Sequence, residues 1–283
     1  MDFFTTTGDM LQLGFVQQAL LAAAVLGLAS GVLAPLVVAR QMAFAVHGTA
    51  ELAFTGAAAA LLLGLSTGGG ALIGALLAAA LLGVLSLRGK ERDAVIGVVL
   101  AFGLGLGVLF QGLYKGRTSN KFSLLVGQII STDSTDLVLL CGSAIIVLII
   151  IAVIYRPLLF ASVDPDVAMA RGVPVRAFGP LFAVLVGVAT SLGVQLVGAL
   201  LVLSLMVTPG AAAARVTANP VTATVLAVLF AETAVLGGIV LSLAPGLQIS
   251  AFVTIISFSI YVICRLIGNR RVERLPKLQP VLV

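Results

Sequence analysis

A single histidine and a nearby glutamate stand out in an otherwise apolar stretch of this sequence. His47 is the only histidine of the 283 residues, and Glu51 follows it four positions later, within residues 42–56. On an α-helix this spacing places both side chains on one face, with their Cβ atoms about 5–6 Å apart. Imidazole and carboxylate are ligand types that zinc and manganese accept. The pair therefore predicts a site for a divalent metal ion.

The composition indicates that this pair lies in a membrane protein. Hydrophobic residues make up 60% of the chain and charged residues only 10%, with a mean hydropathy of +1.22. Soluble domains carry about 25% charged residues. The apolar runs are also much longer than the roughly ten-residue segments of a transmembrane β-barrel. We therefore expect an all-α polytopic membrane protein.

Most apolar runs are long enough to cross a bilayer once, which takes about 20 helical residues. They occupy residues 11–38, 44–65, 71–87, 94–113, 137–155, 177–209, 221–241 and 248–267. As one straight helix the run 177–209 would be about 48 Å long, against a hydrocarbon core of about 30 Å. Gly193, Val194 and Gln195 interrupt it midway. The run therefore predicts one tilted helix, two short crossings or a re-entrant hairpin.

The distribution of basic residues favours the interpretation in which the run 177–209 crosses the membrane and returns. With an external N-terminus, that topology places 13 of the 16 lysines and arginines in cytoplasmic segments, as the positive-inside rule requires. A single crossing would leave 7 inside and 9 outside. We predict about eight to nine transmembrane helices, an external N-terminus and a cytoplasmic C-terminus. The net charge of +5 then marks cytoplasmic loops, and no nucleic-acid partner is expected.

The domain organisation follows from this topology. The chain is predicted to form a single transmembrane domain over residues 1–283, with a core at about 10–267. A long polar loop at 112–136 is predicted to face outward, and residues 268–283 to form a solvated cytoplasmic tail.

Residues 156–176 are predicted to be a cytoplasmic segment that carries a short amphipathic helix. Asp164 can cap this helix, Pro165 suits its first position, and Gly172 can end it.

Three ionisable side chains fall inside apolar runs. Of the 11 acidic residues, only Glu51 and Glu232 do so, together with His47. A charged group near the centre of a bilayer costs about 2.5–3.5 kcal/mol and usually faces a cavity or a partner. We interpret His47 and Glu51 as a metal transit site; the alternative is a hydrogen-bonded pair that holds helices together. For Glu232, helix packing or proton acceptance is as well supported as a metal role.

Two missing motifs narrow the activity. No G-x-x-x-x-G-K-[ST] sequence occurs, so any ATP-driven step is expected to come from another subunit. No H-E-x-x-H occurs either, which argues against an intramembrane zinc protease. A transport role without enzymatic activity of its own is therefore expected.

Three stretches resemble the permease subunits of ATP-binding-cassette importers for zinc and manganese. Residues 42–56 follow that family's M-x-[FY]-x-G-D-x-x-x-H-x-x-x-x-G pattern at Met42, Phe44 and Gly56. His47 and Glu51 stand at its aspartate and histidine positions, so the ligand types are exchanged. Residues 197–215 and 164–174 resemble two further family segments. Because residues 246–250 depart from the family's D-x-P-x-G sequence, the chain is identified as a divergent branch.

The resemblance implies a type II ABC importer permease, homodimeric, with its pathway on the two-fold axis in the cytoplasmic membrane. It also implies two copies of an ATPase subunit below and an extracytoplasmic metal-binding protein above. Zinc, and next manganese, is expected as transported substrate, with no permanently bound cofactor. The alternative is an ion channel or secondary metal transporter without an ATPase. The residues implied in ATPase coupling are Asp164, Pro165, Ala168, Arg171 and Gly172.

Overall fold

The computed structural model of the chain describes residues 7–8, 10–85, 92–116, 134–199, 202–243, 245 and 247–273. All regular secondary structure in these ranges is helical, which confirms the predicted all-α class. The long helices are α2 (Gly14–Ala39), α3 (Ala43–Leu63), α4 (Thr67–Leu85), α5 (Arg92–Leu113), α7 (Ser134–Val163), α9 (Val175–Val197), α12 (Pro220–Leu243) and α13 (Ile249–Glu273). The short helices are α8 (Pro165–Ala170), α10 (Val202–Met206) and α11 (Thr208–Val216).

Seven of the described helices are long and apolar enough to cross a membrane: α2, α3, α5, α7, α9, α12 and α13. Two shorter apolar segments, Thr67–Leu82 and Val202–Val216, accompany them. The outer faces of the bundle are apolar as well, since side chains such as Phe102, Val153 and Phe258 are largely exposed. Outward apolar faces on helices of this length are those of a multi-pass membrane protein.

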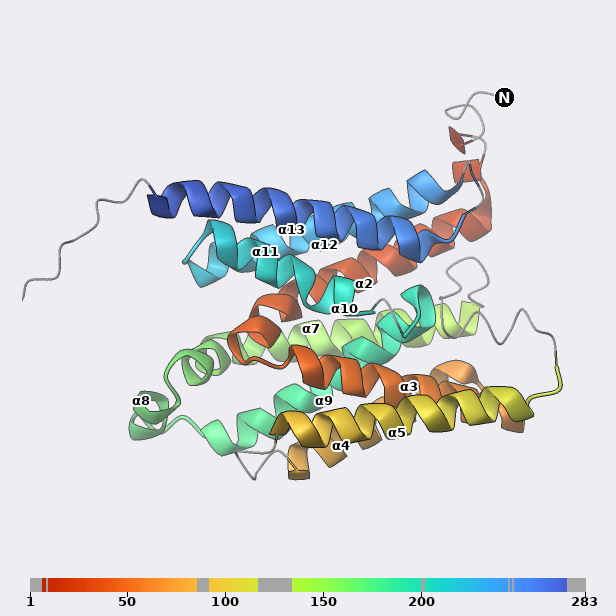
Figure 1. Cartoon of the computed structure of the whole chain (residues 1–283), viewed down its shortest axis with the longest axis horizontal. Coiled ribbons are helices and arrows are strands. Elements are labelled where there is room, and N and C mark those ends of the chain that lie inside the picture. The colour runs from red at the N-terminus through yellow and green to blue at the C-terminus, as the bar shows by residue number, and fades with distance from the viewer. Residues whose placement is uncertain are drawn as a thin grey trace, which may run out of the picture.

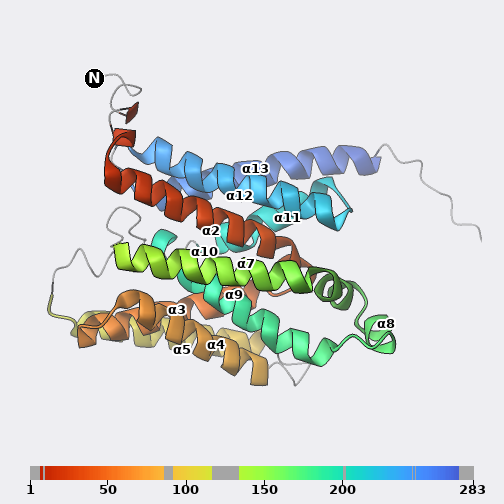
Figure 2. The same cartoon turned by 180° about the vertical axis from the view of Figure 1, so that it is seen from behind.

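The helices form two bundles joined at the start of α3. In one, α2 packs against α11 and α12, and α13 covers α11 and α12; in the other, α3 packs against α4, α5 and α9. Helix α7 contacts both α2 and α9 and so lies between the bundles (Figures 1 and 2). The connection from α2 to α3 passes from one bundle to the other, so the helix that carries His47 begins at this junction.

The long apolar run is a full helix followed by a broken return. Helix α9 continues through Gly193 and Gln195 to Val197, and the chain turns at Gly198, whose φ is 92°. The predicted interruption at residues 193–195 is wrong. Gly193 instead packs against Val202 of α10, so the missing side chain makes room for the returning segment without breaking the helix.

Contacts beyond the turn show where the return leads. Gly268 of α13 packs on the backbone of Arg215 at the end of α11. The Tyr155 hydroxyl of α7 donates to the carbonyl of Pro220 at 3.3 Å. The chain after α11 is therefore back at the end of the molecule where α8 lies and where α13 finishes (Figure 1). This geometry agrees with the run that crosses and returns.

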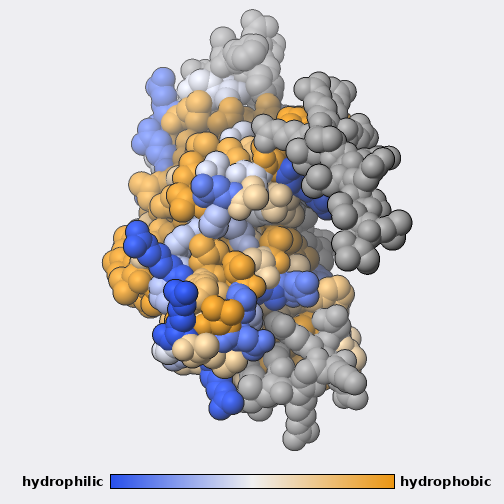
Figure 3. Space-filling view, turned by 90° about the vertical axis from the view of Figure 1, so that its left-hand side faces the viewer, coloured by the Kyte–Doolittle hydropathy of each residue, from blue (hydrophilic) through white to orange (hydrophobic). Residues whose placement is uncertain are grey.

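Basic side chains gather at that same end. Figure 3 looks at it directly and shows hydrophilic side chains spread between hydrophobic ones. Exposed arginines at this end are Arg156, Arg171, Arg176, Arg215 and Arg265. The positive-inside rule predicts that such an end faces the cytoplasm, as the topology from the sequence also predicts.

Two predicted segments fall largely outside the described residues. Residues 117–133 of the predicted outer loop and residues 274–283 of the predicted tail belong to this undescribed part. The first residues of that tail are helical, because α13 continues to Glu273.

Glycines bring α3 and α4 into close contact. Gly70 of α4 lies against the carbonyl oxygen of Gly56 and the Cβ of Ala60, and Gly74 lies against the carbonyl of Leu52. A side chain at either glycine would meet backbone atoms that cannot move aside. Small residues let helix backbones approach in this way within a membrane, and the contact fixes α3 along the half that follows the pair.

The substitution Gly70→Ala is expected to destabilise the protein by about 1–3 kcal/mol, the usual cost of forcing extra atoms into a packed interface. The thermal unfolding midpoint of the purified chain in detergent measures this. Gly105→Ala in α5 is the matched control, because a Cβ there meets nothing within 4 Å. An equal midpoint for the two variants would contradict the packing role of Gly70.

Candidate functional site

Helix α3 begins after a tight turn that follows α2. The backbone N–H of Met42 donates to the carbonyl of Val37 at 2.9 Å, and Gln41 adopts a φ of 53° in the left-handed region. This turn reverses the chain within a few residues, so that His47 lies in the second turn of α3.

His47 and Glu51 are buried on α3 without satisfied polar atoms. Glu51 is 1% exposed and His47 is half-buried. Both Nδ1 of His47 and Oε2 of Glu51 are buried and have no hydrogen-bond partner. Such an unsatisfied group costs about 1–3 kcal/mol. The two side chains therefore do not form the self-satisfied hydrogen-bonded pair of the alternative interpretation, and both atoms can accept a cation.

Contacts with α5 hold the turn that carries Glu51. Gly103 of α5 lies against the side chain of Leu52 and the backbone of Glu51. The Thr55 hydroxyl lies within hydrogen-bonding distance of the carbonyl oxygens of Glu51 and Gly103. Phe44, three residues before His47 on the same side of the helix, is 57% exposed. The face of α3 that bears the pair is therefore exposed at the N-terminal end of this helix.

Glu232 lies in the other bundle. Its carboxylate rests over Gly27 of α2, where an added Cβ would be 3.0 Å from the carboxylate carbon. Helix α12, which carries Glu232, packs on α2, α11 and α13. The described residues contain no group of three or more His, Cys, Asp or Glu side chains able to hold one metal ion. The structure therefore keeps Glu232 apart from the pair, and the described part of one chain places two candidate ligands, His47 and Glu51, on one face of α3.

The segment around α8 has the local structure predicted from its sequence. Asp164 caps the helix by accepting a hydrogen bond from the N–H of Val167 at 3.0 Å, and Pro165 occupies its first turn. Gly172 follows with a φ of 81°. Ala168 is fully buried, whereas Met169 is 46% exposed. The helix is thus anchored on one side and presents an apolar side chain outward.

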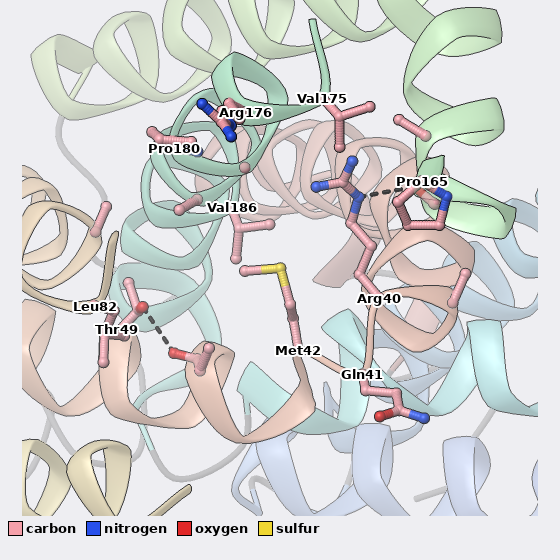
Figure 4. A pocket seen from close by; sticks show the side chains of 17 residues that line it. Arg40, Gln41, Met42, Thr49, Leu82, Pro165, Val175, Arg176, Pro180 and Val186 are labelled. Atoms are coloured by element: carbon pink, nitrogen blue, oxygen red, sulfur yellow. Dashed lines mark hydrogen bonds between the residues drawn. The ribbon is translucent and has the colours of Figure 1, made fainter. Parts of the chain in front are cut away.

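Arg40 links the α2–α3 turn to the segment before α8, a contact that the sequence did not reveal. Its Nε donates to the Ser162 hydroxyl at 2.7 Å, and its guanidinium carbon lies 5.1 Å from the centroid of the Phe182 ring on α9. Ser162 in turn donates to the carbonyl of Leu158 at 2.6 Å. Figure 4 shows Arg40 reaching from the turn toward α7. An arginine directly after a helix was the only signal in the sequence.

Long apolar helices, a capped helix at the basic end and an intramembrane polar pair define a multi-pass transport protein. The chain belongs to the ABC 3 transport family, whose model matches residues 12–268. This match confirms the family resemblance of the three sequence stretches. It also confirms the expected class, a transport subunit of the cell membrane that is not itself an enzyme.

Similarity to known proteins extends over most of the chain. It is 28% identical over 256 residues to the manganese transport system membrane protein MntC of Halalkalibacterium halodurans, covering 90% of this chain and 88% of that protein. It is 27% identical over 150 residues to the high-affinity zinc uptake system membrane protein ZnuB of Haemophilus influenzae, covering 53% and 58%. A chain of the solved structure of PsaBC from Streptococcus pneumoniae in complex with Fab superimposes with a TM-score of 0.86 at 25% identity, covering 95% and 99%.

Proposed function

We propose that this chain is the permease subunit of an ATP-driven importer that moves divalent metal ions into the cytoplasm. The observation that carries the proposal is the buried, unpartnered pair of His47 Nδ1 and Glu51 Oε2 on one face of α3. Membership of the ABC 3 transport family and similarity to manganese and zinc transport proteins support it. Its partners would be two ATPase subunits and an extracytoplasmic metal-binding protein, with the α8 end in the cytoplasm.

A homodimer would complete the metal site. One described chain supplies two ligands, whereas zinc usually takes four in tetrahedral geometry. Two chains related by a two-fold axis would supply two imidazoles and two carboxylates. The exposure of Phe44 on the same face supports an approach of a second copy at this face, and the Glu51 side chain, buried within the single chain, would have to turn toward that copy to reach a shared ion. The ion would then pass along the dimer axis between the two α3 helices.

Zinc is the substrate that this ligand set suits best, and manganese is the second. Two imidazoles and two carboxylates match four-coordinate zinc, whereas manganese favours oxygen-rich sites. A transit site must also release its ion, so it should bind more weakly than a structural zinc site. The pair is buried on one face of α3, and the described residues of the same chain supply no third ligand beside it. Two ligands per chain suit such a weak site.

The coupling path would run from α8 to α3 through Arg40. The residues proposed to receive the ATPase are Asp164, Pro165, Ala168, Arg171 and Gly172. Ser162 lies just before this segment and is bonded to Arg40. Helix α3 begins at Ala43, and from there to His47 is about 6 Å of helix rise, so a shift of the α7–α8 junction would be passed through the α2–α3 turn to the second turn of α3.

The substitutions Glu51→Gln and His47→Ala are each expected to lower ATP-dependent zinc uptake at least about tenfold. Mutation of a residue that only hydrogen-bonds to a metal ligand already lowers metal affinity or activity by about that factor. Vesicles that contain the permease with its ATPase measure this, with manganese as the competing ion. Glu232→Gln is the matched carboxylate change in the other bundle and is expected to keep uptake. Normal uptake in both pair variants would contradict the transit site. Uptake without ATP would favour a channel or a secondary transporter.

The substitutions Ser162→Ala and Arg40→Met are expected to lower the amount of zinc moved per ATP hydrolysed, because each removes the bond between the α7 end and the α2–α3 turn. Hydrolysis and uptake are measured in the same vesicles. Arg156→Gln, an exposed arginine of α7, is the control. An unchanged ratio in both variants, with the control also unchanged, would refute this path. Asp164→Ala should reduce the same ratio through loss of the α8 cap, worth about 1 kcal/mol.

A further inference from the structure

A cavity of about 490 Å³ opens beside α8 at the basic end of the molecule. It is enclosed by the α2–α3 turn, the last turns of α4, the α7–α8 junction and the first half of α9 (Figure 4). Its volume falls within the roughly 300–1,000 Å³ range of small-molecule sites. The cavity is therefore large enough for a ligand of its own.

The cavity lies on a different face of α3 from the metal pair. Met42, Ala45 and Thr49 line it at a spacing that shares one helix face. Thr49 is two residues from both His47 and Glu51, which places its side chain about 200° around the helix from each of them. The cavity is thus distinct from the proposed transit site.

Its lining combines basic side chains with an apolar interior. Arg176 lies exposed at the rim on α9, and Arg40 lines the wall formed by the α2–α3 turn. Figure 4 shows Met42 and Val186 between them, and Leu82 on the far side. None of the described residues that line the cavity is acidic. Along α9 the lining runs from Val175 to Val186, about 16 Å of helix rise.

We propose that this cavity binds one anionic phospholipid from the leaflet at the α8 end. The phosphate would lie by Arg176 and Arg40, and one acyl chain would follow the apolar wall of α9. Basic pockets between transmembrane helices on the cytoplasmic side bind anionic lipid headgroups. A soluble phosphate would use the rim alone, and an acidic side chain of a partner protein would not fill the apolar depth. An amphiphile uses both parts.

The position of this lipid gives it a structural consequence. The cavity touches Pro165 of α8, Ser162 of α7 and the α2–α3 turn. A lipid bound there would hold these three parts in one relative position. This binding does not depend on which ion the protein moves, so it can be tested without transport.

The test measures lipid retained by the full chain after purification from micelles that contain phosphatidylcholine with phosphatidylglycerol, using mass spectrometry. We expect one phosphatidylglycerol per chain, and no stoichiometric phosphatidylcholine. Arg176→Gln should weaken retention about five-fold, the effect of one basic residue near anionic lipid. Ala183→Leu, which fills the cavity from α9, should weaken it as well. Arg156→Gln, an exposed arginine outside the lining, should leave it unchanged.

Three results would overturn the proposal. Equal retention of phosphatidylglycerol by the Arg176→Gln variant and the unchanged chain would show that Arg176 does not bind the headgroup. Equal loss in Arg156→Gln would show attraction to the general positive charge of this end. Displacement by glycerol phosphate together with full retention in Ala183→Leu would show a soluble-anion site at the rim. Because Arg176 is exposed, its variant stays informative even where Ala183→Leu does not fold.

Discussion

Helix α3 carries a buried nitrogen of His47 and a buried oxygen of Glu51 on one face, and neither atom has a hydrogen-bond partner among the described residues. Helix α4 closes on α3 through glycines, and α5 fixes the turn at Glu51 through Thr55 and Gly103. These contacts hold the backbone that carries the pair. Because the backbone holds these polar atoms in place, a partner for them must come from a cation, a solvent molecule or a second chain.

The bundle junction connects this pair to the basic end of the molecule. Helix α3 starts where the chain passes from one bundle to the other, and Arg40 joins that point to the α7 end and to α9. The same region borders the cavity beside α8. Ion passage, ATPase coupling and lipid binding are therefore proposed for adjoining surfaces of a few helices, with the pair and the cavity on separate faces of α3.

The sequence predicted the features that local chemistry determines. The spacing of His47 and Glu51 and the cap of α8 at Asp164 depend on neighbouring residues only, and the helical class follows from composition. The break at residues 193–195 was wrong, because Gly193 is a packing glycine whose partner, Val202, only the fold reveals. The bond from Arg40 to Ser162 joins residues 122 positions apart. The position of Glu232 over Gly27 likewise depends on how α12 packs against α2. Such long-range packing cannot be predicted from one sequence.

Two chains are proposed to share one metal site built from His47 and Glu51, and the number of metal ions bound per chain shows whether they do. Cobalt can stand in for zinc, and its visible absorption reports a tetrahedral site during titration of the purified protein. A shared site predicts one cobalt ion per two chains, with a tetrahedral spectrum that is lost in His47→Ala and in Glu51→Gln. One ion per chain, or an unchanged spectrum in both variants, would contradict it.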